Sequence, residues 1–278
     1  MPIDAEKTIK ELAAKGIRIP PQPSVLIELQ KKYATDNFHI NDLTRIISCD
    51  PGITAMLFKV VRSPVFASHK KFDSLEQVLM LIGIKQTCNL VRAIALCSSF
   101  NINTRKSLEQ FWVRSRELAE IAALIASDRV SVCNIFPDQA YMAAIFHECG
   151  VPVLMQRFPD YCGKLHLDTT QGWPSLIAED KLFNVDHCSI GYLVAHHWNL
   201  PDFVCKAILY HHEIPHEELG AVRTLVAILQ LAIHCYHRIN RASDPQWENL
   251  RLETLSELGI HLDDEGEYYD EITERFMA

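Results

Sequence analysis

The sequence predicts an all-α fold, a helical bundle built in two lobes. Apolar residues recur with the period of an α-helix along nearly all of the 278 residues, and no segment shows the strict alternation of a β-strand. A polar stretch at 101–106 interrupts this pattern. We therefore expect an N-terminal helical lobe over residues 1–103 and a second helical lobe over residues 104–278.

Helix starts and stops support this reading. The proline-rich residues 19–23 must be extended, because a residue that precedes proline avoids the helical region. Before them, Gly16 can end an amphipathic first helix in a left-handed conformation. Short polar side chains precede several apolar segments and can accept hydrogen bonds from the free N–H groups of a first helical turn. The N-caps predicted in this way are Ser24, Asp50, Ser74 and Asp186.

The second lobe is expected to contain longer helices. One runs from about 108 to 126, and another covers 138–149 and carries His147. Residues 161–182 are expected to be loop-rich. A last long apolar helix covers 220–239, and C-terminal helices with an acidic tail follow it.

Composition indicates a globular protein without a nucleic-acid partner. Hydrophobic residues make up 48% and charged residues 22%, which is ordinary for a folded domain. The net charge of -8 opposes nucleic-acid binding, which needs a concentrated basic face. Nine cysteines stand singly, none in a C-x-x-C pair, as is typical of reduced core cysteines in a cytosolic protein.

No segment predicts a membrane partner or a secretion signal. Residues 1–15 are charged and amphipathic, unlike a signal peptide. The most apolar late segment, 225–235, is interrupted by Gln230 and His234 and is too short to cross a bilayer. We therefore expect a soluble cytoplasmic protein.

One stretch, 143–150, places two adjacent polar residues, His147 and Glu148, at the end of an apolar run. Burying two such groups costs several kcal/mol unless a partner satisfies them. A divalent metal is one partner, because imidazole nitrogen and carboxylate oxygen both bind such ions. A neighbouring side chain is the other.

Several segments, taken in order, resemble the HDOD family (HD-related output domain) of bacterial signalling proteins. They span about residues 19 to 213 in the order and spacing of that family. The first lobe contributes Ile19-Pro20-Pro21-Gln22-Pro23, the run from Ile46 to Thr54, and Ser74-Leu75-Glu76-Gln77-Val78 leading to Gly83. The second lobe contributes Phe111-Trp112, Phe146-His147-Glu148-Cys149-Gly150, Val185-Asp186-His187 and Tyr210-His211-His212-Glu213.

The resemblance implies an HD-domain-like second lobe, related to the HD and HD-GYP metal-dependent phosphohydrolases. In those enzymes helices converge on one or two metal ions that activate a water against a phosphoester. His187, His211 and His212 match ligand positions of the HD-GYP branch. Two other ligand positions are altered. Arg114 occupies the position where the family has a histidine, and Ile233 lies near the position where the family has its last ligand, an aspartate.

These departures predict a vestigial site without a metal cofactor or a catalytic residue. A guanidinium cannot deprotonate to become a ligand, and an aliphatic side chain donates nothing. Glu148, in place of the usual aspartate, is one methylene longer. We expect Arg114 to form an ion pair with Glu148 instead. The residual metal candidates, should a metal bind, are His147, Glu148, His187, His211 and His212.

The function predicted from the resemblance is a non-catalytic regulatory module that acts through a protein partner of a signalling pathway or through a small ligand. One alternative is a divergent metal-dependent phosphohydrolase. Another is a nucleotide or cyclic-dinucleotide sensor in which Arg114 meets a phosphate. Trp173 and Pro174 are candidates for a partner surface, since tryptophan is enriched at binding hot spots. Alternatively, Trp173 folds back over its own loop.

Overall fold

The computed structural model describes residues 11–14, 16–35, 39–66, 74–100, 106–167 and 173–278. Within these ranges the chain forms helices and no strand, which confirms the all-α prediction. The first group of helices is α2 (Ser24–Tyr33), α3 (Ile40–Ser48), α4 (Pro51–Val61), α5 (Leu75–Ile82) and α6 (Ile84–Ser99). The second group is α7 (Lys106–Cys133), α8 (Pro137–Phe146), α9 (Gly150–Arg157), α10 (Tyr161–Lys164), α11 (Leu176–Phe183), α12 (His187–His197), α13 (Asp202–Tyr210), the 3-10 turn η2 (Glu217–Leu219), α14 (Ala221–Ile239), α15 (Trp247–Glu257) and α16 (Glu265–Met277).

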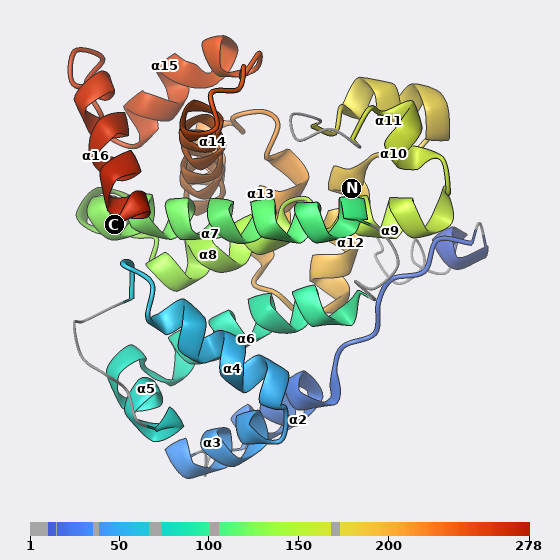
Figure 1. Cartoon of the computed structure of the whole chain (residues 1–278), viewed down its shortest axis with the longest axis vertical. Coiled ribbons are helices and arrows are strands. Elements are labelled where there is room, and N and C mark those ends of the chain that lie inside the picture. The colour runs from blue at the N-terminus through green and yellow to red at the C-terminus, as the bar shows by residue number, and fades with distance from the viewer. Residues whose placement is uncertain (1–10, 15, 36–38, 67–73, 101–105, 168–172) are drawn as a thin grey trace.

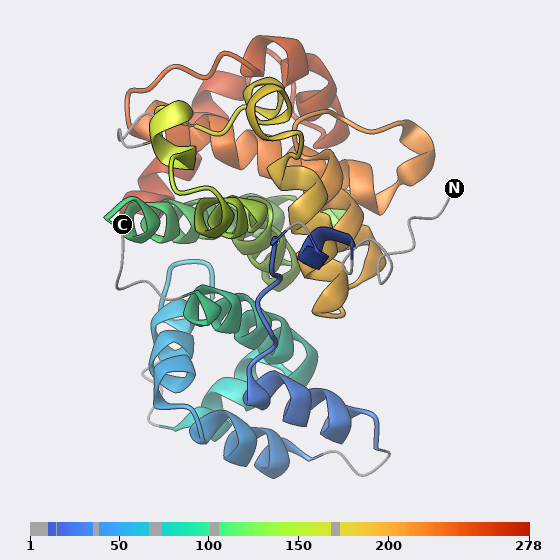
Figure 2. The same cartoon turned by 90° about the vertical axis from the view of Figure 1, so that its right-hand side faces the viewer.

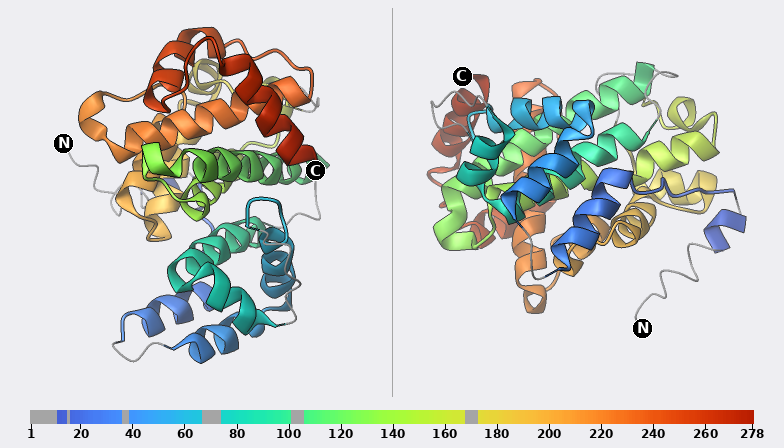
Figure 3. Two further views of the ribbon diagram at one scale, coloured as in Figure 1. Left: turned by 90° about the vertical axis from the view of Figure 1, so that its left-hand side faces the viewer. Right: turned by 90° about the horizontal axis from the view of Figure 1, so that it is seen from below.

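The two groups lie one above the other, with α2–α6 below and α7–α16 above (Figure 1). They meet where α6 packs along α8. At the far end of the second group, α15 and α16 lie against α14, and α16 also reaches α7 (Figure 3). The break expected at 101–106 falls mostly on residues 101–105, which lie outside the described residues, so the division at residue 103 stays a prediction.

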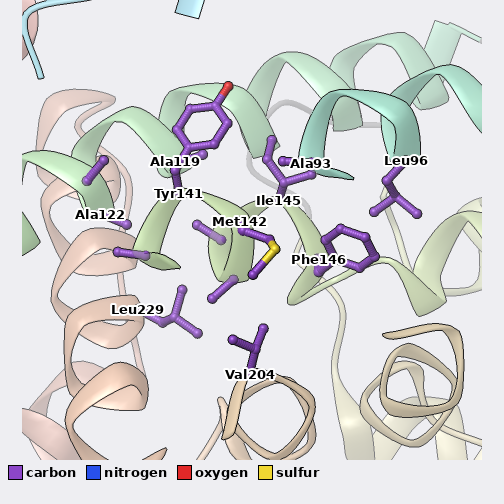
Figure 4. Close-up of a cluster of buried hydrophobic side chains, with 14 of the residues drawn as sticks. Ala93, Leu96, Ala119, Ala122, Tyr141, Met142, Ile145, Phe146, Val204 and Leu229 are labelled. Carbon is purple, nitrogen blue, oxygen red and sulfur yellow. The ribbon is translucent and has the colours of Figure 1, made fainter. Parts of the chain in front are cut away.

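Helix α8 is the centre of the second group. Eight of its residues are buried, from Asp138 and Ala140 through Phe146. It contacts α6, α7, α13 and α14, so apolar neighbours cover it from several sides (Figure 4). Small residues at 140, 143 and 144 let the neighbouring backbones approach closely, whereas Met142 and Phe146 fill the spaces between them.

The predicted N-caps are confirmed at three positions of four. The backbone N–H of Ile53 donates to Asp50 Oδ1 at 3.0 Å, that of Gln77 to Ser74 Oγ at 3.2 Å, and that of Ser189 to Asp186 Oδ1 at 2.7 Å. The prediction for Ser24 is wrong by one residue. Pro23 occupies the N-cap with an extended backbone, and Ser24 is already helical.

The second lobe differs from the prediction in two segments. The helix expected over 138–149 ends at Phe146, and a new helix, α9, begins at Gly150. Residues 161–182, expected to be loop-rich, contain α10 and the start of α11. Helix α11 positions a buried carboxylate, Glu179, that is described below.

Before α2, the extended segment 17–23, which we call the strap, lies against the second lobe although it belongs in sequence to the first (Figure 2). The indole Nε1–H of Trp198 donates to the Pro20 carbonyl at 2.9 Å, and Gln22 Nε2 donates to the His197 carbonyl at 3.1 Å. Ile17 is buried. The strap therefore ties the start of the chain to the end of α12.

Among the described helices, none is by itself both long and apolar enough to cross a membrane. Helices α5 and α6 satisfy that test only when taken together, and they are bent by 115° where they join.

We predict that Trp198→Phe destabilises the fold more than Trp112→Phe does. Both indoles are fully buried, but within the described part of the chain the Trp112 Nε1–H has no hydrogen-bond partner, whereas that of Trp198 holds the strap. Each substitution removes similar ring volume. Only Trp198→Phe leaves the Pro20 carbonyl without its donor, which costs a further ~1–2 kcal/mol. Urea denaturation of both variants measures the difference, and equal losses would contradict the role of the strap.

Candidate functional site

His187 is held by a buried carboxylate. As the first residue of α12, it follows the Asp186 N-cap, and its imidazole Nδ1 lies 2.7 Å from Glu179 Oε2. The same oxygen accepts from the His187 backbone N–H at 3.0 Å, and Tyr161 donates its hydroxyl proton to Glu179 Oε1. Glu179 is fully buried and thus fixes both the ring of His187 and the start of α12.

His211 and His212 meet the other edge of His187. They follow the end of α13, where the Nδ1 of His211 lies 2.7 Å from the Ile208 carbonyl. The Nε2 of His187 lies 3.4 Å from the Nε2 of His211 and 3.0 Å from the Nε2 of His212. Three imidazole nitrogens, one from the start of α12 and two from just beyond α13, therefore lie close together.

Cys188 adds a sulfur to this group, which we call the histidine cluster: His187, Cys188, His211 and His212. Its thiol Sγ lies 3.7 Å from the Nε2 of His187 and 3.6 Å from the Nδ1 of His211. One ligand atom from each of the four residues lies within 4.8 Å of the others. Imidazole and thiolate together suit zinc and similar transition metals.

His147 faces the same cluster. Its Nδ1 lies 2.6 Å from the Ala144 carbonyl, and its ring meets that of His211 edge-on at 5.0 Å between centroids. The Nε2 atom is buried and has no hydrogen-bond partner among the described residues. A bound ion would satisfy such an atom.

Glu148 turns to α7 and forms the ion pair expected with Arg114, which confirms that prediction. Arg114 Nη2 lies 3.0 Å from Glu148 Oε2, and the two side chains are 14% and 1% exposed. The guanidinium also lies over the Trp173 ring, 4.2 Å from its centroid. Glu148 Oε1 is buried without a partner in the described part of the chain.

The pKa values follow from burial and from these neighbours. Burial lowers the pKa of His147, lowers that of His211 well below its ordinary value, and lowers that of His212 to about 4. Burial alone would raise the pKa of Glu148, but Arg114 and the neighbouring histidines together outweigh it and lower that pKa. Three neutral imidazoles and one carboxylate result near neutral pH.

His187 behaves in the opposite way. Burial opposes its charged form, yet the Cys188 sulfur and the Glu179 carboxylate raise its pKa well above the ordinary value. A protonated His187 can donate its Nε2–H toward the Nε2 of His212, 3.0 Å away. The residues of the cluster would also fit a divalent metal, because imidazole and thiolate are ligands of zinc and similar ions.

The structure brings together five of the residues identified from sequence: His147, Glu148, His187, His211 and His212. Ile233 is buried in α14 and offers no donor atom. The structure does not support a fully exposed surface at Trp173 and Pro174. Trp173 is half-buried against Arg114 and the His237 ring, at 4.7 Å from the latter, and Pro174 is buried.

Sequence reasoning missed Glu179, Cys188 and Gln246. Glu179 lies in the segment expected to be loop-rich, so no helical pattern drew attention to it. Cys188 directly follows His187, and that adjacency was the one available signal. Gln246, whose Oε1 lies 3.1 Å from the Nδ1 of His212, is 34 residues away from it in sequence.

Comparisons with known proteins show the family and the fold. The HDOD domain matches residues 19–214. An HDOD domain protein of unknown function from Geobacter sulfurreducens is similar in structure, with a TM-score of 0.65, 22% identity and 98% of each chain covered. A protein proposed to be a phosphohydrolase, from Shewanella amazonensis SB2B, gives a TM-score of 0.70 at 17% identity, covering 98% of this chain and 95% of that one.

A curated relative is an uncharacterized protein of Treponema pallidum (strain Nichols), 24% identical over 221 residues. The match covers 77% of this chain but only 42% of that relative's length. The chain shares its all-helical fold with these solved structures. More narrowly, the chain belongs to the HDOD family.

We predict that Gly150→Ala strongly destabilises the protein. Gly150 opens α9, and a Cβ there would lie 2.1 Å from the backbone carbonyl oxygen of His187. Because the clash is with backbone, α9 and α12 must separate, at a cost of ~3 kcal/mol or more. Gly163→Ala in α10 is the matched control, since nothing lies within 4 Å of its Cβ and alanine favours a helix. Thermal melts of both variants measure the difference in stability. A Gly150→Ala protein as stable as Gly163→Ala would contradict the close approach of α9 to the backbone of His187.

We also predict that Arg114→Ala costs ~3–5 kcal/mol, because it leaves the Glu148 carboxylate buried without its cation. Arg238→Ala is the control. Its 3.1 Å ion pair with Asp270 joins side chains 43% and 73% exposed, and such pairs contribute at most ~1 kcal/mol. Chemical denaturation measures both. The double variant Arg114→Met with Glu148→Gln should recover most of the loss, and failure to recover would assign the effect to Trp173 packing instead.

Proposed function

We propose that this HDOD protein is a non-catalytic regulatory module of signal transduction. The observation that carries the proposal is the ion pair of Arg114 with Glu148. Glu148 is the carboxylate beside the histidine cluster, and a fixed guanidinium already neutralises it. A metal ion bound by Glu148 would lie close to that permanent positive charge, and like charges repel strongly in a buried site.

Trp173 strengthens this arrangement. Its ring covers the Arg114 guanidinium and also contacts the His237 ring of α14. The arginine is thus held between a carboxylate and an aromatic face, and that combination favours a planar cation. For the same reason, Arg114 is poorly placed to meet a nucleotide phosphate, so the sensor alternative in that form loses support.

In this proposal the protein acts through a protein partner of a signalling pathway or through a small ligand. Family membership supports the signalling role, and a structural neighbour from Marinobacter aquaeolei VT8 is itself proposed to be a signal transduction protein. Its TM-score is 0.71 at 20% identity, covering 98% of this chain and 64% of that one.

A second candidate function is metal-dependent phosphoester hydrolysis, favoured by the convergence of His187, His211 and His212. With the orphan Nε2 of His147, these residues would hold the ion. When bound, a divalent metal lowers the pKa of a coordinated water and polarises a phosphoryl oxygen. In this candidate, His187 keeps its ring fixed by Glu179, as a metal-ligating histidine does with a carboxylate.

We predict no turnover of bis-p-nitrophenyl phosphate by the purified protein with added Mn²⁺, beyond that of the buffer. The reason is that Arg114 neutralises Glu148 and stands in the place of a further ligand. Metal content, measured on the same sample by mass spectrometry, separates binding from catalysis. Turnover that disappears in His147→Ala, while that variant keeps its fold by circular dichroism, would establish the hydrolase instead.

A further inference from the structure

A pocket of about 360 Å³ lies between the two groups of helices. We call it the interlobe pocket. Its walls come from α2 and α6 of the first group and from α8 and α13 of the second. None of the histidine cluster lines it, so it is separate from the site described above.

One part of the interlobe pocket is apolar. Leu26 and Leu29 contribute buried side chains, and Tyr33, Pro201 and Phe203 add partly or fully exposed faces. The Tyr33 side chain is 56% exposed. Aromatic and aliphatic walls of this kind, with few polar groups between them, are typical of pockets for small organic molecules.

The polar part is cationic. Lys85 and Arg92 lie on the same face of α6, and no aspartate or glutamate is among the residues that line the pocket. This is unusual for a chain with 35 acidic and 27 basic residues. Arg92 Nη1 donates to Asn89 Oδ1 at 3.0 Å, and Asn89 Nδ2 donates to the buried Asp138 at 2.7 Å. Lys85 is exposed and forms no ion pair within the described part of the chain.

The helix ends around the pocket also favour a negatively charged ligand. Lys85, Gln139 and Phe203 belong to the first turns of α6, α8 and α13, whose N-terminal ends carry partial positive charge. Only one helix, α2, presents its C-terminal end there, through Ala34. Gln30 is also among the residues that line the pocket, although its Nε2 atom is itself buried.

We propose that the interlobe pocket binds a small amphipathic organic anion, with an aromatic body against Tyr33 and Phe203 and a phosphate or carboxylate head on Lys85. Arg92, on the same face of α6, supplies further donors to the head. Since its walls come from both groups of helices, such a ligand contacts both at once. The proposal does not depend on the absence of turnover at the histidine cluster, and the two are measured separately.

The test is isothermal titration of the full chain with three probes that share one ring system: 2-naphthyl phosphate, 2-naphthoate and 2-naphthol. We expect at least one anion to bind about tenfold or more tightly than the neutral 2-naphthol, and its head identifies the preferred chemistry. Lys85→Gln should weaken that anion about tenfold. Lys59→Gln is the matched control, an exposed lysine on α4 that does not line the pocket.

A footprint locates the bound probe. Cys88 lines the pocket and is half-buried, whereas Cys49 is exposed on α3 outside it. The preferred anion should slow iodoacetamide labelling of Cys88, measured by mass spectrometry at mildly alkaline pH, and leave Cys49 unchanged. The proposal would be overturned if neither anion binds, or if 2-naphthol binds as tightly as the anions. It would also be overturned if Lys85→Gln leaves the affinity unchanged, or if the bound anion does not protect Cys88.

Discussion

The burial of α8 is the constraint on which the rest of the structure depends. An apolar helix must be covered, and α6, α7, α13 and α14 do so. The same contacts join the two groups of helices, because α6 belongs to one and the other three to the second. At its end the chain reaches His147 and Glu148 while still inside this core, so each needs a buried partner. The site is therefore a consequence of how the core is closed.

At this end of α8, Arg114 neutralises Glu148 through a direct ion pair. Glu148 Oε1 and His147 Nε2 stay buried without a partner among the described residues. The charges of these groups influence one another, because the groups are buried close together and charge interactions are weakly screened there. The arginine therefore does more than fill space. It holds the Glu148 carboxylate in an ion pair beside a cluster of imidazole nitrogens.

Local features were predictable from sequence, and long-range ones were predictable only through family resemblance. Asp50, Ser74 and Asp186 act within their own helical turns, so their roles follow from neighbouring residues. The ion pair of Arg114 with Glu148 joins residues 34 positions apart, and the resemblance to the HDOD family is what predicted it. Glu179 could not be inferred, because its partner His187 is reached only when α11 folds back on α12. The interlobe pocket needs four helices at once, and no single segment carries its pattern.

The strap gives the chain an unusual order of assembly. The hydrogen bond from Trp198 to Pro20 joins residues 178 positions apart. At ordinary rates of translation, roughly 10–40 s pass between the synthesis of one partner and of the other. Through that interval, residues 17–23 leave the ribosome before the surface that receives them exists. The strap therefore cannot dock before the end of α12 has been synthesised, so its docking completes the contact between the two lobes late in folding.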